Sequence, residues 1–393
     1  MLGCAFSKMQ HFAVTSKAGR NYFKILLAGT LVVLGQSAFS QWLDGSDVTI
    51  NEIMTEHNGA MLEIGYELNA ENITEHHPAY IFIRYSRDGG TTWELLDQLY
   101  FQGEGAGMVL SPGLKKVVVW GSEELGLDNP QIKVRGIQMA RVPAGDFKMK
   151  SFPAGGKDSF TSARPNTILP EFYMAVNETT ISMYTSYLNE MGRDGSGWHD
   201  RMADERRGGI IRTDTLNGFA YAVRSGREDY PITYVSWYDA CSFLQWCGLI
   251  LPSEAMFEKA YVGGFYLDGD DAKQKKNPFP ERQYPWGNEL PGAEGIYRCN
   301  YDGEADGYTN LALVGTFSKF SSPYGINDLA GNVAEWTVDW YNTTYHIGLD
   351  GFRMVRGGSW LDLPLAVDAV SGATQFPIKE SSIMGFRGVF CPD

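Results

Sequence analysis

The stretch that decides the fold covers residues 324–341 and reads YGINDLAGNVAEWTVDWY. Two shorter motifs follow it, Arg-Gly-Gly-Ser-Trp at 356–360 and Gly-Phe-Arg at 385–387. The tryptophans of these motifs are expected to be buried, because packing explains such large aromatic side chains more often than ligand stacking does. Glycines allow the backbone to turn tightly. The C-terminal part of the chain is therefore expected to be a mixed α+β unit with many loops.

Several further motifs precede this stretch in a fixed order. They are Arg-Val-Pro-Ala-Gly at 141–145, Phe-Tyr-Met-Ala-Val-Asn-Glu-Thr-Thr at 172–180, Val-Ser-Trp-Tyr-Asp-Ala at 235–240, Leu-Pro-Ser-Glu-Ala at 251–255 and Tyr-Pro-Trp-Gly at 284–287. The ordered set resembles the formylglycine-generating enzyme family, also called the sulfatase-modifying-factor domain. The resemblance runs from about Met139 to the end of the chain and implies a C-type-lectin-like fold.

The resemblance also implies where a catalytic site would lie. Family members that oxidise a substrate cysteine to formylglycine hold copper(I) with two cysteines placed shortly after the Arg-Gly-Gly-Ser motif. The matching positions here are Asp362 and Val367. Because soft sulfur selects copper(I), a carboxylate and an isopropyl group cannot replace the pair. No copper and no catalytic residue are therefore expected, and Ser359 and Trp360 are interpreted as parts of the folded loop.

Two oxygen-rich segments resemble the family's calcium sites. The implied ligands are Asn300, the Tyr301 carbonyl, Asp306 and the Tyr308 carbonyl in the first site, and Asp328, the Gly331 and Val333 carbonyls and Glu335 in the second. Carboxylate, amide and backbone oxygens suit calcium, and both ions are expected to be structural. The alternative for each segment is a solvated acidic loop. An EF-hand at 302–313 is excluded, because its last position is Leu313 where a carboxylate is needed.

Composition and charge narrow the class of protein. The 393 residues carry a net charge of −14, with 47 acidic and 33 basic residues. A nucleic-acid partner is not expected, because there is no lysine or arginine surplus to displace counterions from phosphates. A chain of this length predicts two domains once a targeting segment is removed.

The N-terminus predicts a signal peptide over residues 1–40. Lys17, Arg20 and Lys24 precede an apolar run at 25–34, and small residues at 38–40 suit a signal peptidase. The run is shorter than the roughly 20 residues that span a bilayer. We therefore expect an exported protein with no integral membrane span after cleavage, located in the periplasm, at the outer membrane or outside the cell.

Residues 41–137 are expected to form an immunoglobulin-like β-sandwich, and residues 138–393 the sulfatase-modifying-factor-like domain. The β-rich run at 79–86, a turn at 88–90 and strands near 116–120 and 131–135 support the sandwich. The spacing from Ser86 to Trp93 also matches the Asp-box of sialidase propellers, but a propeller needs repeated blades.

Helices in the second domain are expected at 183–191, at 237–246 with Ser236 as the cap, and after Ser253 through 260. The charged stretches 192–214 and 267–282 lack a helical period and are expected to be surface loops.

Four cysteines follow the expected cleavage site: Cys241, Cys247, Cys299 and Cys391. They could form up to two disulfides, whose pairing stays open, or remain as buried free thiols. Cys241 and Cys247 are expected on one helix, about 9 Å apart, which is too far for a bridge between them.

Three functions from different classes remain. The leading one is an exported, non-catalytic binding or structural protein of the bacterial cell envelope, with an envelope partner and with secretion or gliding assemblies as the precedent implied by resemblance. The alternative is an oxidoreductase of the formylglycine-generating and sulfoxide-synthase superfamily with a displaced metal site, which would need Cys391 and another thiol. The third, a diversified ligand-binding protein of the retroelement type, is disfavoured because residues 361–384 contain no Asn or Tyr. The ligand and the oligomeric state stay open.

Overall fold

The computed structural model describes residues 48–392, apart from 71, 151–166, 342–350 and 370. The expected signal peptide at 1–40 lies outside the described residues. Within the described ranges, no helix has both the length and the apolar character that crossing a membrane requires.

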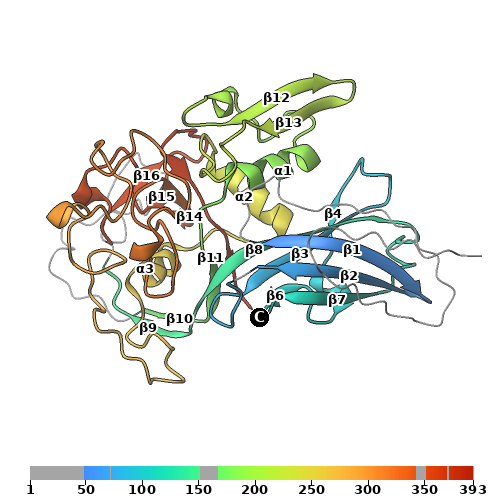
Figure 1. Cartoon of the computed structure of the whole chain (residues 1–393), viewed down its shortest axis with the longest axis horizontal. Coiled ribbons are helices and arrows are strands. Elements are labelled where there is room, and N and C mark those ends of the chain that lie inside the picture. The colour runs from blue at the N-terminus through green and yellow to red at the C-terminus, as the bar shows by residue number, and fades with distance from the viewer. Residues whose placement is uncertain (1–47, 71, 151–166, 342–350, 370, 393) are drawn as a thin grey trace, which may run out of the picture. The chain divides into compact units, whose positions relative to one another are not determined.

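The first part of the described chain is built from two antiparallel sheets (Figure 1). One sheet has the order β1-β2-β7-β5, with β1 (Thr49–Asn58), β2 (Met61–Asn69), β7 (Gly113–Trp120) and β5 (Phe101–Gln102). Alternate residues of β2 are buried, as expected for a strand with one face on a core. The buried residues are Leu62, Ile64, Tyr66 and Leu68.

The other sheet has the order β18-β11-β8-β3-β4, with β6 also paired to β3. Its strands are β18 (Val389–Phe390), β11 (Phe172–Ala175), β8 (Gln131–Val142), β3 (Ala79–Ser86), β4 (Glu94–Leu95) and β6 (Gly107–Val109). Side chains of β2 and β3 share one hydrophobic cluster, so the two sheets enclose a common core. The immunoglobulin-like assignment of this part stays a prediction.

Strand β8 crosses the expected domain boundary at 137/138 without interruption. Its residues 131–138 pair with β3, and residues 139–142 pair with β11. The change of partner falls next to the expected boundary, but the strand itself continues. One sheet therefore contains strands from both segments of the chain (Figure 1).

A buried cluster of charges joins α1 and α2 to this sheet. Glu190 accepts hydrogen bonds from Arg84 Nε (3.2 Å), Lys133 Nζ (2.9 Å) and Trp246 Nε1 (2.9 Å). Arg135 forms a further ion pair with the same carboxylate at 2.8 Å. One buried anion thus holds three cations from β3 and β8, and a tryptophan from α2.

Of the three α-helices in the described ranges, two begin at the serine caps that the sequence predicts, and the first begins two residues before its expected start. They are α1 (Ile181–Met191), α2 (Trp237–Cys247) and α3 (Glu254–Val262). The Ser236 side chain accepts from Asp239 N, and the Asp239 carboxylate accepts from Ser236 N, which forms a capping box. The Ser253 side chain caps α3 by accepting from Met256 N. The predicted helices are confirmed, each with small shifts at its ends.

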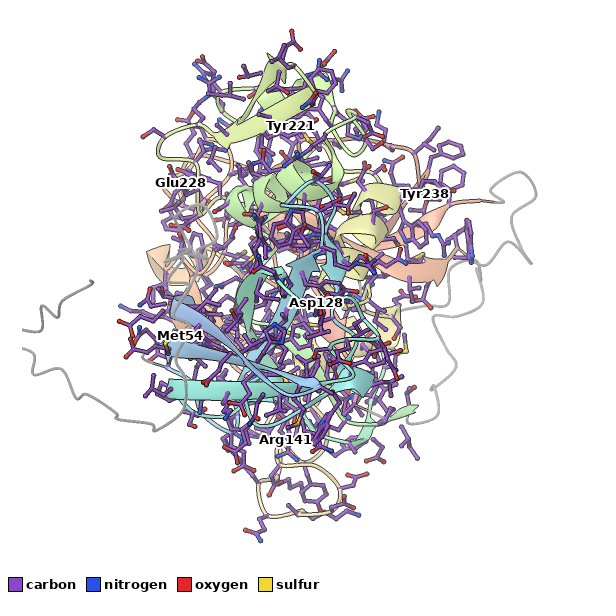
Figure 2. All side chains as sticks on the ribbon, turned by 90° about the vertical axis from the view of Figure 1, so that its right-hand side faces the viewer. Met54, Asp128, Arg141, Tyr221, Glu228 and Tyr238 are labelled. Carbon is purple, nitrogen blue, oxygen red and sulfur yellow. The ribbon has the colours of Figure 1, made fainter. Side chains whose placement is uncertain are left out.

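The expected loop at 192–214 is wrong in part. It contains the 3₁₀ helix η2 (Asp200–Ala203) and β12 (Ile210–Thr215), which pairs with β13 (Gly218–Val223). Tyr221, labelled in Figure 2, anchors the hairpin, because its hydroxyl donates to the Gly192 carbonyl at 2.7 Å. This contact reaches across 29 residues, so local sequence periodicity does not reveal it.

The C-terminal sheet has the order β16-β15-β14-β17 and lies beside α3 (Figure 1). Its strands are β16 (Gly372–Gln375), β15 (Arg353–Arg356), β14 (Ala334–Trp340) and β17 (Met384–Gly385). The remaining elements are the pair β9 (Gly145–Phe147) and β10 (Thr167–Leu169) and the 3₁₀ helices η1 (Gln98–Tyr100), η3 (Ala293–Gly295), η4 (Ser318–Phe320) and η6 (Pro364–Ala366). The described residues are therefore mostly β with three α-helices.

All four cysteines after the expected cleavage site are free thiols. Cys247 and Cys299 are buried, and Cys241 and Cys391 are partly buried. Of the two alternatives left open by the sequence, the structure has unpaired thiols.

Candidate functional site

The positions where the family resemblance implies copper-binding cysteines belong to a closed loop. The Asp362 carboxylate accepts from the backbone N of Ser359 at 2.8 Å and from its hydroxyl at 2.6 Å. Val367 is fully buried, and its carbonyl accepts from the Tyr261 hydroxyl at 2.5 Å. Both positions therefore have structural partners, and neither supplies sulfur.

The two glycines of the Arg-Gly-Gly-Ser motif explain how this loop turns. Gly357 and Gly358 have φ values of +89° and +69°, a region that other residues rarely adopt. A Cβ added to Gly358 would lie 2.7 Å from Val367 Cγ1. Arg356 supports the turn by donating to the Ala369 carbonyl at 2.6 Å. The motif fixes a tight loop against the buried valine.

The thiols elsewhere in the described chain have raised pKa values. Burial raises the pKa of Cys241 to about 11 and that of Cys247 to about 12. Burial also raises the pKa of Cys299 and of Cys391. These raised pKa values keep the thiols protonated at neutral pH, so a soft metal would have to displace their protons in order to bind.

The first expected calcium site contains a buried oxygen with no partner. Asn300 is 1% exposed, and its Nδ2 donates to the Asn310 carbonyl and to Asn332 Oδ1. Its Oδ1 has no hydrogen-bond partner. Leaving a buried acceptor unpaired costs about 1–3 kcal/mol, and a cation would satisfy it.

The rest of that site is organised around Asp306. Its carboxylate accepts from the backbone N of Tyr301 at 3.1 Å and of Tyr308 at 2.9 Å, so it bridges the two residues whose carbonyls were expected as ligands. Burial raises the Asp306 pKa, and a bound cation would oppose that shift. These residues fit calcium.

The second expected site lies in a buried group with more anions than cations. Arg387 is fully buried and donates to both oxygens of Glu335 at 2.7–3.0 Å. Asp328 and Glu178 are also buried. The Asp328 carboxylate accepts from Gly315 N at 2.6 Å. Arg387 thus pairs directly with Glu335, while Glu178 and Asp328 act on it as nearby charges.

Burial raises the pKa of all three carboxyl groups. The pKa of Asp328 rises to about 6. For Glu178, the charges of Asp328 and Glu335 add to the effect of burial in raising the pKa. A divalent ion would neutralise the excess charge, so the site fits calcium by charge. However, no group of three or more His, Cys, Asp or Glu side chains in the described ranges is placed to hold a metal. The fit of both sites therefore depends on amide and carbonyl oxygens as well.

Sequence reasoning missed two members of this group. Glu178 accepts from Asn332 Nδ2 at 2.7 Å and from Val333 N at 3.2 Å, so it supports the turn that carries two expected ligands. Arg387 reaches Glu335 across 52 residues. Both lie in motifs that the sequence displays, at 172–180 and 385–387, but no local signal shows that they are buried together.

A histidine between two carboxylates was also not predicted. His199 Nε2 lies 2.7 Å from Asp239 Oδ2, and its Nδ1 lies 2.7 Å from Glu380 Oε1. Burial alone would lower its pKa, but Asp239 and Glu380 together raise it. The imidazolium therefore links α2 to the C-terminal segment at mildly acidic pH.

Comparison with known proteins identifies the family. Residues 126–390 match the model of the sulfatase-modifying factor enzyme 1-like domain. The matched residues make up more than half of the chain. The chain belongs to this family. The family resemblance expected from the sequence is confirmed, and the match includes the motifs from 141 to 387.

Relatives in this family include both an enzyme and an inactive member. The chain is 29% identical to the formylglycine-generating enzyme of Thermomonospora curvata, over 56% of this chain and 76% of the relative. It is 28% identical to inactive C-alpha-formylglycine-generating enzyme 2 of Bos taurus, over 65% of this chain and 86% of the relative. The solved structure of PvdO from Pseudomonas aeruginosa is 18% identical, with a TM-score of 0.42 over 64% of this chain and 94% of that chain.

Proposed function

We propose that this protein is an exported, non-catalytic binding or structural protein of the bacterial cell envelope. The observation that carries the non-catalytic part is the loop at 359–367, where Asp362 binds Ser359 and Val367 is fully buried. An inactive relative of similar extent supports it, because the same scaffold exists there without the activity. Export and the envelope location rest on the sequence of residues 1–40.

Two structural calcium ions belong to the proposal. Asn300, Asp306 and the carbonyls of Tyr301 and Tyr308 would hold the first, and Asp328, Glu335 and the carbonyls of Gly331 and Val333 the second. An ion that binds only the folded chain stabilises it by mass action. The first ion would give the Asn300 Oδ1 acceptor a partner, and the second would neutralise the excess charge of the buried carboxylates.

The positive role proposed is assembly with an envelope protein partner, such as a component of a secretion or gliding apparatus. The N-terminal segment, expected to be immunoglobulin-like, is a suitable spacer or docking unit. Its junction with the rest is tied by the buried Glu190 cluster, so both segments would present one surface. In-cell crosslinking followed by mass spectrometry tests this: a specific envelope partner is expected, and capture of no partner above the level of an unrelated exported control would contradict it.

The non-catalytic proposal is tested with copper and a peptide substrate. The purified chain is titrated with copper(I) against a chelator and then incubated with oxygen and a cysteine-containing sulfatase peptide. We expect neither tight copper(I) binding nor conversion of the peptide thiol to an aldehyde. The double variant Asp362→Cys, Val367→Cys is the matched gain-of-binding control, and it is expected to take up copper(I).

One outcome would establish the alternative instead. If the unmodified chain oxidises the peptide in a copper-dependent way, and Cys391→Ser abolishes this, the protein is an oxidoreductase with a displaced site. Among the described residues, no group of three or more His, Cys, Asp or Glu side chains is placed to hold a metal, which argues against that outcome. Activity that survives Cys391→Ser would equally overturn the non-catalytic proposal and would point to a different set of ligands.

A further inference from the structure

A polar cavity of about 440 Å³ lies where segments distant in the sequence meet. Its polar side chains are four carboxamides and one hydroxyl, from Asn72, Gln138, Asn177, Asn327 and Ser318. None of the described side chains that line it is charged. In a chain with a net charge of −14, this neutral lining is a distinct chemical environment.

Backbone hydrogen bonds hold the lining in place. The Gln138 carbonyl on β8 accepts from Val176 N at 3.0 Å, just beyond the end of β11. Asn327 N donates to the Val176 carbonyl at 2.9 Å, and Asn327 Nδ2 donates to Asn177 Oδ1 at 2.8 Å. Three of the four residues that supply carboxamides are thus joined by hydrogen bonds, Gln138 through its backbone carbonyl. The cavity is preformed, which reduces the entropy lost when a ligand binds.

The chemistry of the lining selects the class of ligand. A carboxamide offers both a donor and an acceptor, as a ligand hydroxyl does, so the two can pair in either direction. A charged ligand would lose its hydration without gaining an opposite charge. A volume of this size lies within the range of about 300–1,000 Å³ typical of small-molecule sites.

A second cavity nearby does not compete for this role. It shares Gln138 and Asn177 in its wall, but it is enclosed mainly by apolar side chains, among them Met183, Phe243 and Leu249. Its volume is about 20 Å³, little more than one water requires. Only the polar cavity of the two can admit a ring-sized ligand.

We propose that the polar cavity binds a neutral polyhydroxylated ligand, namely a sugar unit, with Gln138, Asn177 and Asn327 pairing with its hydroxyl groups. This inference goes beyond the proposed function and does not rest on it. The lining includes neither Asp362 nor Val367, so sugar binding is separable from any result on catalysis or on envelope partners.

The test is saturation-transfer NMR and calorimetry on the full chain. The neutral probes are glucose, N-acetylglucosamine, maltose and cellobiose, and the charged counterparts are glucuronic acid and glucosamine. Gln138→Leu removes hydrogen-bonding groups from the cavity with little change in volume. Ser318→Trp fills the cavity from an exposed position, so folding is expected to survive. Gln131→Leu, on the exposed start of the same strand, is the matched control.

We expect at least one neutral probe to bind, with weaker binding of its charged counterparts. Gln138→Leu should weaken that binding at least about tenfold, as the loss of a partly buried hydrogen-bonding group predicts. Ser318→Trp should abolish it, and Gln131→Leu should leave it unchanged. The proposal is overturned if no neutral probe binds at millimolar concentration, if a charged probe binds more tightly, or if binding persists in a folded Ser318→Trp variant.

Discussion

Substitution of Glu190 by Gln is expected to destabilise the protein strongly. The carboxylate is buried and faces Arg84, Lys133 and Arg135 at 2.8–3.2 Å. Removing one partner of a buried ion pair costs about 3–5 kcal/mol, because the opposite charge stays buried without compensation. Here Gln would also point an amide donor at groups that only donate. We expect the free energy of unfolding to fall by about 3–5 kcal/mol.

The assay is urea denaturation followed by tryptophan fluorescence, because Trp246 donates to Glu190 at 2.9 Å and reports on the site. Glu94→Gln is the matched control, since Glu94 pairs with Arg87 at the exposed surface. Exposed pairs contribute about 0–1 kcal/mol. A Glu190→Gln effect no larger than that of Glu94→Gln would refute the conclusion that this cluster ties the sheet to the helices.

The pH dependence gives the same prediction a second readout. Burial alone would raise the Glu190 pKa, but Arg135, Lys133 and Arg84 lower it below its ordinary value of 4.5. A carboxyl group with a lowered pKa in the folded state stabilises the protein above its unfolded pKa and loses that effect as pH falls through the folded pKa. The difference in stability between wild type and Glu190→Gln should therefore be full above about pH 4.5 and shrink below it.

Three other outcomes are expected. Removing calcium with a chelator should lower the melting temperature, because calcium at a hundredfold excess over Kd stabilises the folded chain by about 2.7 kcal/mol. Asn300→Ala should reduce this stabilisation. Equal melting temperatures with and without calcium would exclude both sites. His199→Gln should remove a contribution that is full below pH 6.5, the ordinary pKa of histidine, and is lost as pH rises through its raised folded value. Melting curves over pH 5–9 would count against this if both proteins vary alike. Gly358→Ala should cost about 1–3 kcal/mol through its positive φ, and its new Cβ would also lie 2.7 Å from Val367 Cγ1. Gly226→Ala, also at positive φ but with no atom within 4 Å of the new Cβ, should cost less in the same denaturation assay.

Local chemistry is what the sequence predicts best in this protein. Ser236 and Ser253 mark the starts of α2 and α3. Each hydroxyl accepts from a backbone N–H three residues later, so the signal for a cap lies within four residues of sequence. The turn at Asp88 also follows from sequence, and its carboxylate accepts from the backbone N of Thr91 and Thr92. The motifs from 141 to 387 were sufficient to identify the family.

Long-range pairing is what the sequence did not reveal. The contact between Glu190 and Arg84 spans 106 residues, and the one between Arg387 and Glu335 spans 52. Hydrophobic periodicity describes one element at a time, so it does not show which distant charges share a buried site. The same limit explains the missed hairpin of β12 and β13 and the continuity of β8 across the expected boundary.

The unbroken course of β8 has a consequence for truncation. A deletion ending at residue 137 would cut β8 and make Gln138 the new N-terminus. Strand β11 would keep only residues 139–142 of β8 as its partner. The sheet β18-β11-β8-β3-β4 would be divided between the two fragments, whereas β1-β2-β7-β5 would stay whole in the first and β16-β15-β14-β17 in the second. Because β8 runs from 131 to 142 as one strand, it joins the two segments of the chain without an intervening loop.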